Sequence, residues 1–556
     1  MKKFFKKISK KILEKNLLSL LLSLISLSLV FIFVFAYITG PDKWLIISKV
    51  PSFIRVNTRE SLESIRNLSY LKYINVEHGL PEYNIKIDKD KLESLRNEIP
   101  KQSEQLTDEY KNYEDAEFVD GDREYKIKIR KRGVSKNHWL WDKKSWRIQF
   151  DDNLFLGIKN LNFIVPFDRS YLVEQFNHYR AKRLGLTVPR SFFSVVRING
   201  KDPAVYWTVE HYEKEMLEVA QLSSDANFYG ESDEYTNNTS YGNLFDSLDN
   251  FKKYNNDLRF AEGNFAEVEL LRYLVNDADE KEFKENIFSI VDKDSFYSWS
   301  IHNALAFGQH QDWGHNIRYY FDSSLGKFKF IPIDVVMFSI DDDSSDPMFF
   351  EEHSNILINK ILAIPEFMSE RNYRLWQYVG NENNLKDELE YYDQLYYDTK
   401  IAFYQDDIRR GANKDFDKEV AVYRDKIVGN VETMRDLFND INFSGSVREG
   451  DNNFVFNIKT RSLSPLFVEK IKILSNDEET EKQINLEILP DIELIQLPSP
   501  KEIYPVINDY YKAFKLNFSQ LNIKIDNIDF GYEEDFDVKI LIRNKYTDQL
   551  FEFNIN

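Results

Sequence analysis

Two aspartates and one asparagine frame a short stretch of the chain, residues 310–341, with side chains that suit phosphate chemistry. Asp312 and Asn316 precede an aromatic run, and Asp334 follows a second apolar run. The two runs are separated by a turn that ends in Gly326, which is the pattern of a β-hairpin. Because a hairpin brings its two ends together, we expect these three polar side chains to lie close to one another.

Phosphoryl transfer is the chemistry that this set of side chains supports. Magnesium binds oxygen ligands, usually one or two carboxylates together with phosphate oxygens, so Asn316 and Asp334 are the predicted metal ligands. A further carboxylate has to accept the proton of the attacking hydroxyl, and Asp312 is the predicted base. The residues follow the order of a kinase catalytic core, with a shorter gap after Asp312. The alternative is that all three only cap backbone groups at the ends of the hairpin.

Basic residues upstream of the hairpin are candidates for holding a nucleotide. A strand is predicted at 125–129 and is followed by a glycine turn that contains Arg132. Another strand is predicted at 143–150, and it begins with Lys143 and Lys144. A glycine turn can bring backbone amides close to phosphates, and a lysine can reach them as a point charge. The alternative is that both lysines are simply solvated.

Two glutamates are further candidates in this part of the chain. A helix is predicted at 170–184, and Glu174 on it is either an exposed surface residue or, as in kinases, the partner of Lys144. Two more strands follow, and the second ends at Glu210. Its position resembles the connector that binds adenine in kinases, and only that position supports the assignment.

The composition excludes several classes of function. The chain has 556 residues, which is enough for several domains, and 15% of them are aromatic. Its formal net charge is −19, which argues against nucleic acid as a general partner because phosphate backbones require basic surfaces. It has no cysteine, so disulfides, zinc–thiolate sites and cysteine nucleophiles are excluded.

The N-terminal region predicts a single-pass membrane anchor. Residues 1–16 form a basic cytoplasmic tail with seven lysines, and residues 17–38 carry no charge over the length of one transmembrane helix. The lysines should stay in the cytoplasm, which places the rest of the chain on the outer face of the cell membrane. A cleavable signal peptide is the alternative, although residues 36–41 make a poor cleavage site.

The rest of the chain is predicted to be of the α+β class. Residues 42–115 form a small mixed region, and residues 116–440 form the candidate catalytic domain. Within that domain, the polar stretch 222–260 is expected to be a long surface loop, and 355–439 is expected to be helical. Residues 441–556 alternate as several strands, which predicts a β-sandwich that serves as a spacer or binding module.

Taken together, the motifs of residues 80–440 resemble the CotH kinase family, the family of spore coat protein H. The matching motifs occur in the family's order: Arg132-Gly133 through Ser135, Lys143 through Phe150, Asp168 through Leu172, Leu184 through Pro189, Val209-Glu210, Asp294 through Phe296, Asp312 through Asn316, and Phe330 through Asp334. No single motif is strong, and the ordered set carries the resemblance.

The resemblance implies an atypical, bilobal protein-kinase-like fold that uses ATP and Mg²⁺ or Mn²⁺. Its implied partner is a protein of the cell surface or envelope, phosphorylated on Ser or Thr. By analogy, Asp312 is the catalytic aspartate, and Asn316 and Asp334 bind the metal. Lys144, or Lys143 beside it, is then the nucleotide lysine.

The sequence departs from the family pattern at three places. Val134 stands where asparagine is common, Val173-Glu174 replaces an Arg-Asn pair, and Val336 stands where a second acid often follows Asp334. The missing acid bears most on the metal assignment. The alternative function is therefore a catalytically inactive, surface-displayed binding or adhesion protein with a kinase-like fold.

Overall fold

The structure, a computed structural model, describes most of the chain after residue 66. The described residues are 28, 67–101, 106–151, 153–232, 235, 243–255, 263–308, 310–311, 314–339, 355–406, 408–450, 453–475, 493–494, 498–506, 511–516, 519–526 and 536–555. They fall into two compact units. One contains residues 1–77 and 410–418, and the other contains residues 78–409 and 419–556.

The first unit is small in its described part and is held together by polar contacts. Its short 3-10 helix η2 (Leu68–Tyr73) carries Tyr70, whose hydroxyl donates to Oδ2 of Asp417 over 2.6 Å. The backbone N–H of Asn413 donates to Oδ1 of Asn67 over 2.7 Å. These bonds join segments that are far apart in sequence.

The predicted transmembrane segment, residues 17–38, lies outside the described residues apart from Ser28. The basic tail at 1–16 lies outside them as well. Among the residues that the structure describes, no helix is both long and apolar enough to cross a membrane. The anchor therefore stays a prediction.

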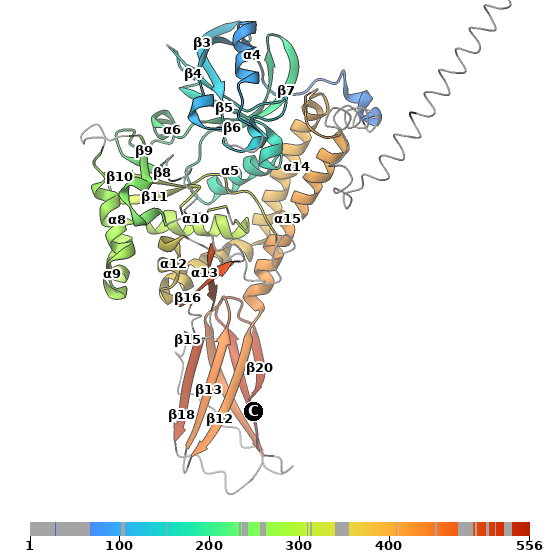
Figure 1. Cartoon of the computed structure of the whole chain (residues 1–556). Helices are drawn as coiled ribbons and strands as arrows, with labels where there is room; N and C mark the ends of the chain where they lie inside the picture. Colours follow the sequence, from blue (N-terminus) through green and yellow to red (C-terminus); the bar gives the residue numbers. More distant parts are fainter. Residues whose placement is uncertain are drawn as a thin grey trace, which may run out of the picture. The chain divides into compact units, whose positions relative to one another are not determined.

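The second unit begins with a closed β-barrel (Figure 1). Most neighbouring strands are antiparallel, and a parallel pair, β1 with β6, closes the barrel. In barrel order the strands are β1 (Glu82–Lys86), β2 (Glu114–Asp120), β3 (Arg123–Lys131), β4 (Trp146–Phe150), β5 (Asn160–Ile164), β7 (Lys201–Glu210) and β6 (Ser191–Ile198). The predicted boundary at residue 115 falls inside β2, so the mixed region and the start of the catalytic domain share one barrel.

Alternating side chains explain why β4 has a core face and a polar face. Trp146, Ile148 and Phe150 are buried in the barrel core, and Arg147 between them points the other way. Helix α4 (Lys89–Asn97) adds Leu92 and Leu95 to the same core. The strand therefore presents its charged residue on the outer face of the barrel.

A second, four-stranded sheet carries the central hairpin. Its order is β11 (Lys327–Pro332), β10 (Ile317–Asp322), β8 (Phe228–Glu231) and β9 (Phe251–Asn255). The predicted hairpin is confirmed, with Ile317 paired to Pro332 at its open end. The prediction of a long surface loop over 222–260 is wrong, because β8 and β9 lie there and Phe228 and Phe251 are buried. The two strands were not predicted because each is a short apolar run between long polar stretches, and so few residues show no clear alternation of apolar and polar side chains.

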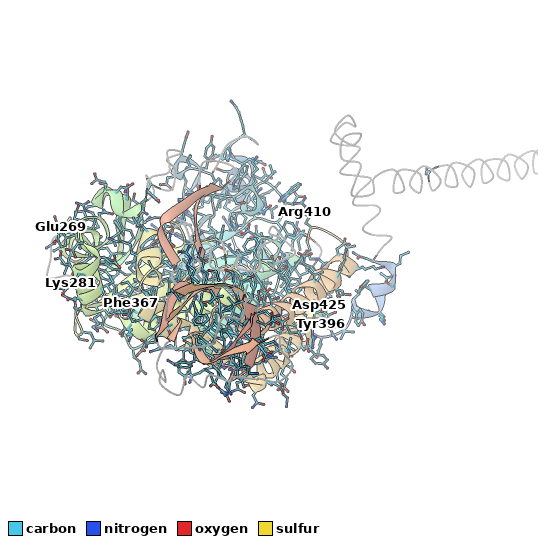
Figure 2. All side chains as sticks on the ribbon, turned by 90° about the horizontal axis from the view of Figure 1, so that it is seen from below. Glu269, Lys281, Phe367, Tyr396, Arg410 and Asp425 are labelled. Carbon is cyan, nitrogen blue, oxygen red and sulfur yellow. The ribbon has the colours of Figure 1, made fainter. Side chains whose placement is uncertain are left out.

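Helices make up most of the rest of residues 116–440, and 355–439 is helical as predicted, apart from short connections. Seen from below, Glu269 on α8 and Lys281 on α9 lie at the outer edge (Figure 2), while Val268 and Leu271 of α8 are buried. The helices are α5 (Val173–Arg183), α6 (Lys214–Val219), α8 (Ala266–Asn276), α9 (Glu280–Ile290), α10 (Lys293–Leu305), α12 (Ile356–Leu362), α13 (Pro365–Val379), α14 (Glu382–Tyr404) and α15 (Asn413–Asn439).

The C-terminal region consists of small sheets. One contains β12 (Asn442–Gly450), β13 (Asn453–Arg461) and β18 (Ser519–Asp526). Another contains β15 (Glu493–Leu494), β14 (Leu466–Ser475), β19 (Phe536–Asn544) and β20 (Leu550–Ile555), and a third pairs β16 (Pro498–Val506) with β17 (Tyr511–Leu516). Phe456 and Ile458 of the first share a buried core with Ile540 and Ile542 of the second. Helices and sheets together give the predicted α+β class.

Candidate functional site

The open end of the β10–β11 hairpin brings two predicted metal ligands together. Asn316 directly precedes β10, and its Nδ2 donates to the backbone carbonyl of His310 over 2.9 Å. His310 in turn contacts Asp334, just after β11, with its Nδ1 2.9 Å from the Asp334 carbonyl. Asn316 and Asp334 both have left-handed backbones, with φ of 61° and 52°. The pairing of the strands therefore places both residues at one mouth.

The carboxylate of Asp334 lies between two cationic or protonatable groups. Nη1 of Arg169 forms an ion pair with its Oδ1, and Nδ1 of His310 lies 3.5 Å from its Oδ2. Arg169 ends the 3-10 helix η5 (Pro166–Arg169), which follows barrel strand β5. The barrel thus supplies a positive charge to the hairpin mouth.

Arg169 also connects this mouth to the glycine turn. Its Nε lies 3.4 Å from Oδ2 of Asp168, and the same oxygen lies 3.1 Å from Nε2 of His138. Burial would raise the pKa of Asp168, but the hydrogen bond from His138 and the charge of Arg169 outweigh it and hold that pKa well below its usual value. Asp168 is therefore an anion, and neutral His138 donates to it.

His138 packs directly against Gly133 in the predicted glycine turn. Gly133 has φ of 87°, and a β-carbon added there would lie 2.1 Å from Cδ2 of the His138 imidazole. Nδ1 of the ring lies 2.9 Å from the hydroxyl of Ser145. Glycine is required at this turn by its backbone conformation and by the close approach of the ring.

Four arginines gather beside the hairpin mouth, and we call Arg130, Arg132, Arg147 and Arg169 the arginine cluster. Arg130 and Arg147 are direct cross-strand partners on β3 and β4. Burial, followed by the charges of Arg169 and Arg147, lowers the pKa of Arg132 to about 9. Like charges facing each other across strands destabilise a sheet unless an anion compensates them. The cluster is therefore suited to bind a polyanion.

Arg132 is the member of the arginine cluster with unused hydrogen-bonding capacity. Its Nε and Nη1 atoms are buried and have no hydrogen-bond partner among the described residues. A buried donor without a partner is destabilising, so such a group usually bonds a protein group, an ordered water or a ligand. Guanidinium groups match phosphate oxygens in geometry and charge. The orphaned atoms fit a phosphate ligand.

Arg147 is held in place by polar neighbours on the outer face of the barrel. Its Nε donates to Oδ1 of Asn162 over 2.8 Å, and its Nη2 lies 3.4 Å from Nδ1 of His211. Burial, followed by Arg147 and Arg132, lowers the pKa of His211 well below its ordinary value, so the ring is neutral. Burial raises the pKa of nearby Glu213 to about 7, against the hydrogen bond from the Asn160 amide. The cluster therefore keeps an excess of positive charge.

Both predicted nucleotide lysines are engaged elsewhere. Lys144 donates to the carbonyls of Trp139 and Trp141 over 2.7 and 3.1 Å, and burial lowers its pKa to about 8. Lys143 forms a buried ion pair with Asp406. These contacts give both lysines structural roles, and their assignment to the nucleotide stays a prediction.

The two predicted glutamates also have partners of their own. Glu174 is only 2% exposed and accepts a hydrogen bond from the backbone N–H of Val336 over 2.8 Å, so neither an exposed position nor a pair with Lys144 describes it. Glu210 ends β7, and its carboxylate receives two hydrogen bonds, of 2.9 and 2.8 Å, from the guanidinium of Arg190 and one of 3.4 Å from the backbone N–H of Arg190. The side chain of Glu210 is thus paired with Arg190 at the barrel.

The predicted base, Asp312, lies outside the described residues. Within the part of the chain that is described, no group of three or more His, Asp or Glu residues is placed to hold a metal ion. Asn316 and Asp334 alone would supply two oxygen ligands, which is what magnesium uses when phosphates complete its shell.

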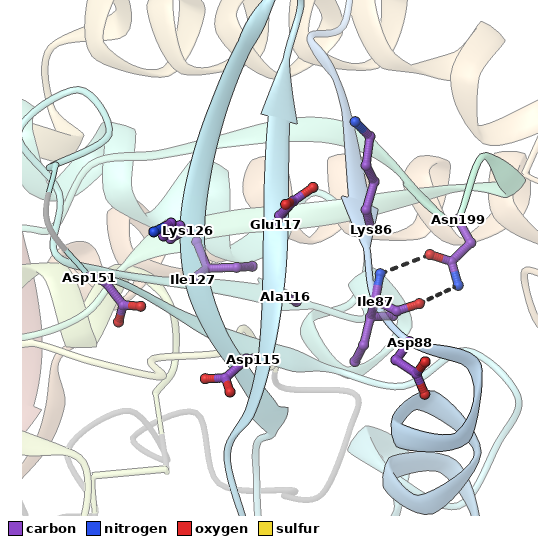
Figure 3. A pocket seen from close by; sticks show the side chains of 10 residues that line it. All are labelled: Lys86, Ile87, Asp88, Asp115, Ala116, Glu117, Lys126, Ile127, Asp151 and Asn199. Carbon is purple, nitrogen blue, oxygen red and sulfur yellow. Dashed lines mark hydrogen bonds between the residues drawn. The ribbon is translucent and has the colours of Figure 1, made fainter.

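A groove of about 600 Å³ lies elsewhere on the barrel (Figure 3). It runs over β1, β2 and β3 and is lined by Lys86, Ile87, Asp88, Asp115, Ala116, Glu117, Lys126, Ile127, Asp151 and Asn199. The Asn199 amide bonds both the N–H and the carbonyl of Ile87 over 2.9 Å. The groove has mixed charge and contains none of the predicted site residues.

Sequence reasoning missed the arginines as a group. Arg130 lies on β3, Arg132 follows the end of that strand, and Arg147 lies outward on β4, but the register of β3 against β4 could not be read from the sequence. Knowledge that Arg130 lies opposite Arg147 on the neighbouring strand would have identified the arginine cluster. Arg169 was missed for a different reason: the residues next to it in sequence do not indicate that its side chain contacts Asp334.

Comparison with known proteins gives one family and one distant relative. A family model described as CotH kinase protein matches residues 129–440, more than half of the chain. Inner spore coat protein H of Bacillus subtilis (strain 168) is 24% identical over 200 residues, which cover 34% of this chain and 53% of that protein. The alignment thus spans about half the length of that relative. The matched range includes both the hairpin mouth and the arginine cluster.

Proposed function

This chain belongs to the CotH kinase protein family, and we propose on that premise that it transfers phosphate from ATP to Ser or Thr of a protein. In this proposal the barrel and the helical region are the two lobes of an atypical kinase-like fold. Family membership supports the kinase-like class, and the polar groups beside the hairpin support a phosphate-handling site.

The observation that carries the proposal is the pair of orphaned Arg132 nitrogens within the arginine cluster. The charges of Arg169 and Arg147 act on buried Arg132, so an anion bound beside these three arginines would be stabilised. A triphosphate supplies that charge together with acceptor oxygens. In this proposal Arg132, which the sequence already named as a candidate, holds the phosphates together with Arg147 and Arg169, in place of Lys144 and Lys143.

Asn316 and Asp334 are the residues that would hold Mg²⁺ or Mn²⁺. Their amide and carboxylate oxygens are hard ligands, as these ions require. When bound, the ion neutralises charge on the transferring phosphate. Arg169 then has to share or release the carboxylate of Asp334, with which it pairs in this structure. Asp312 accepts the proton of the attacking hydroxyl in this scheme.

The cellular setting of the proposal rests on the sequence. Residues 17–38 would anchor the protein in the cell membrane, and the family region would face outward. The acceptor is then a protein of the surface or envelope. The C-terminal sheets would act as a spacer or as a binding module for that protein.

A surface-displayed binding protein without activity is the second candidate. Val336 stands where a second acid would complete a metal site, and both oxygens of Asp334 already have neighbours in Arg169 and His310. In this case the arginine cluster would hold another anion or none.

The test is nucleotide binding and transfer by the full-length protein in detergent micelles. We expect ATP with Mn²⁺ to raise the melting temperature, because a ligand that binds the native state stabilises it. Arg132→Gln should weaken ATP binding by about tenfold or more through loss of charge-assisted hydrogen bonds. Arg374→Gln is the matched control, since Arg374 pairs with Asp294 and Glu370 on helices α10 and α13.

The same preparation decides between the two candidates. Transfer of labelled phosphate from ATP to the protein itself or to a co-purified protein supports the kinase. If the protein neither binds ATP with Mn²⁺ or Mg²⁺ nor labels any acceptor, the kinase proposal is wrong. The second candidate, a binding protein without activity, then remains.

A further inference from the structure

The segment after the hairpin has an unusual backbone at Val336. This residue has φ of 60°, in the left-handed region that β-branched residues strongly disfavour. Asp334, two residues earlier, is left-handed as well. Such conformations persist only where the surroundings enforce them, and they are concentrated at functional sites. Something must therefore hold Val336.

Helix α5 holds Val336 by both of its backbone polar groups. The N–H of Val336 donates to Oε1 of Glu174 over 2.8 Å. Its carbonyl accepts from Nδ2 of Asn177 over 2.9 Å. Glu174 and Asn177 are three residues apart, so they lie on one face of the helix. We call this pair of contacts the α5 clamp.

The α5 clamp is itself fixed inside the protein. Glu174 and Asn177 are 2% and 1% exposed, so neither side chain is free to follow a moving loop. The backbone carbonyl of Asn177 lies 2.9 Å from Nε2 of His302 on α10. Further along the same segment, the N–H of Phe338 donates to the carbonyl of Ala306 over 2.9 Å. The clamp thus ties the segment to the helical core.

We propose that Glu174 and Asn177 are positioning residues that set the place of Asp334 by holding Val336 in its left-handed conformation. Asp334 is attached to Val336 through a single residue, so the backbone torsions at 336 decide where its carboxylate lies. The inference rests on the proposed function, because it takes Asp334 to be a metal ligand. This role also explains why Glu174 is present on α5 although it does not pair with Lys144.

Hydrogen exchange of the full-length protein tests the clamp without any ligand. We expect Glu174→Ala to speed exchange of the amides in 333–339, and Glu174→Gln to leave it unchanged because the amide oxygen still accepts from Val336. Glu267→Ala is the matched control, since Glu267 accepts hydrogen bonds from Asn227 and Tyr229 away from the hairpin mouth. Unchanged exchange in Glu174→Ala overturns the clamp.

Binding of Mn²⁺ with a non-hydrolysable ATP analogue, followed by calorimetry, tests the positioning. Glu174→Ala should weaken this binding by about tenfold or more, as loss of an outer partner of a metal ligand does. Glu174→Gln and Glu267→Ala should bind like the wild type. Adding Val336→Gly to Glu174→Ala should recover part of the affinity, because glycine adopts a left-handed backbone without help.

The outcomes separate the clamp from the proposed function. Faster exchange with unchanged affinity overturns the positioning role while leaving the kinase proposal intact. A wild-type protein that does not bind the Mn²⁺–nucleotide complex overturns the proposed function. The positioning of Asp334 as a metal ligand is then rejected as well, even if hydrogen exchange confirms the contacts of the α5 clamp. If Glu174→Ala does not fold, Asn177→Leu, which removes the donor to Val336 without adding a charge, has the same expected effects.

Discussion

Nε2 of His138 lies 3.1 Å from Oδ2 of Asp168, and this contact joins the glycine turn to the hairpin mouth. On one side, the His138 ring packs against Gly133. On the other, Asp168 lies beside Arg169, which pairs with Asp334. A disturbance in the glycine turn is therefore transmitted through named contacts to the residue proposed to bind the metal.

Gly133→Ala should destabilise the protein more than another glycine substitution does. The added β-carbon would lie 2.1 Å from the His138 ring, so the ring has to move in addition to the strain at φ of 87°. We expect a loss of about 2–4 kcal/mol, measured by urea denaturation. Gly121→Ala is the control, because Gly121 also has positive φ but has open space around it. Equal losses would show that the His138 contact is unimportant.

The stability of the protein should fall in mild acid because His138 is buried as a neutral ring. Burial lowers its pKa to about 4, although the hydrogen bond that it donates to Asp168 opposes the shift. In the unfolded chain the pKa is about 6.5, so the unfolded state takes up the proton first as the pH falls. The stabilisation is thus complete above about pH 6.5 and is lost progressively toward about pH 4.

Urea denaturation across this range, in the wild type and in His138→Gln, measures the effect of that histidine. The variant should show a shallower dependence of the unfolding free energy on pH, by at most about 1.4 kcal/mol per pH unit. Buried His178 and His302, whose pKa values are lowered to about 3, keep contributing in both proteins. Identical pH dependence in the two proteins would contradict a neutral, buried His138.

Arg169→Gln should destabilise the metal-free protein and make it more responsive to cations. Without the guanidinium, the carboxylates of Asp168 and Asp334 are left near each other with less compensating charge. We expect a loss of about 2–4 kcal/mol, because both partners are mostly buried. Mn²⁺ should raise the melting temperature of the variant more than that of the wild type. An equal rise in both would argue that Arg169 and the cation do not share Asp334.

Lys143→Met and Lys144→Met separate structural lysines from nucleotide-binding ones. Lys143→Met leaves Asp406 buried without its cation, so we expect a loss of about 3–5 kcal/mol in stability. Lys144→Met should be milder, since Lys144 bonds only carbonyls. If the arginine cluster holds the phosphates, the folded variants keep the ATP affinity of the wild type, measured by calorimetry. A tenfold or greater loss in Lys144→Met alone would restore the lysine assignment.

Much of the local structure was predictable because it repeats with a short period. The hairpin around Gly326, the strands at 125–129 and 143–150 and the helices of 355–439 all follow their predicted patterns, with shifts at their ends. The stretch 222–260 was predicted wrongly, since two short strands within polar sequence have no period of sufficient length. Closure of the barrel through the parallel pair of β1 and β6 could not be read at all, because it joins segments over a hundred residues apart.

By itself, the sequence determined the α+β class, the resemblance to one family, and the place of Asn316 and Asp334 at the ends of one hairpin. These features depend on neighbours in the chain, whose chemistry is visible as a pattern. Only the tertiary structure shows that Lys144 donates to two loop carbonyls, that Glu174 accepts from the N–H of Val336, and that Arg132 has buried nitrogens beside three other arginines. Those facts depend on which strands and helices, distant in sequence, pack against each other. Burial, charge and hydrogen bonding act between residues that are close in space, whatever their separation along the chain.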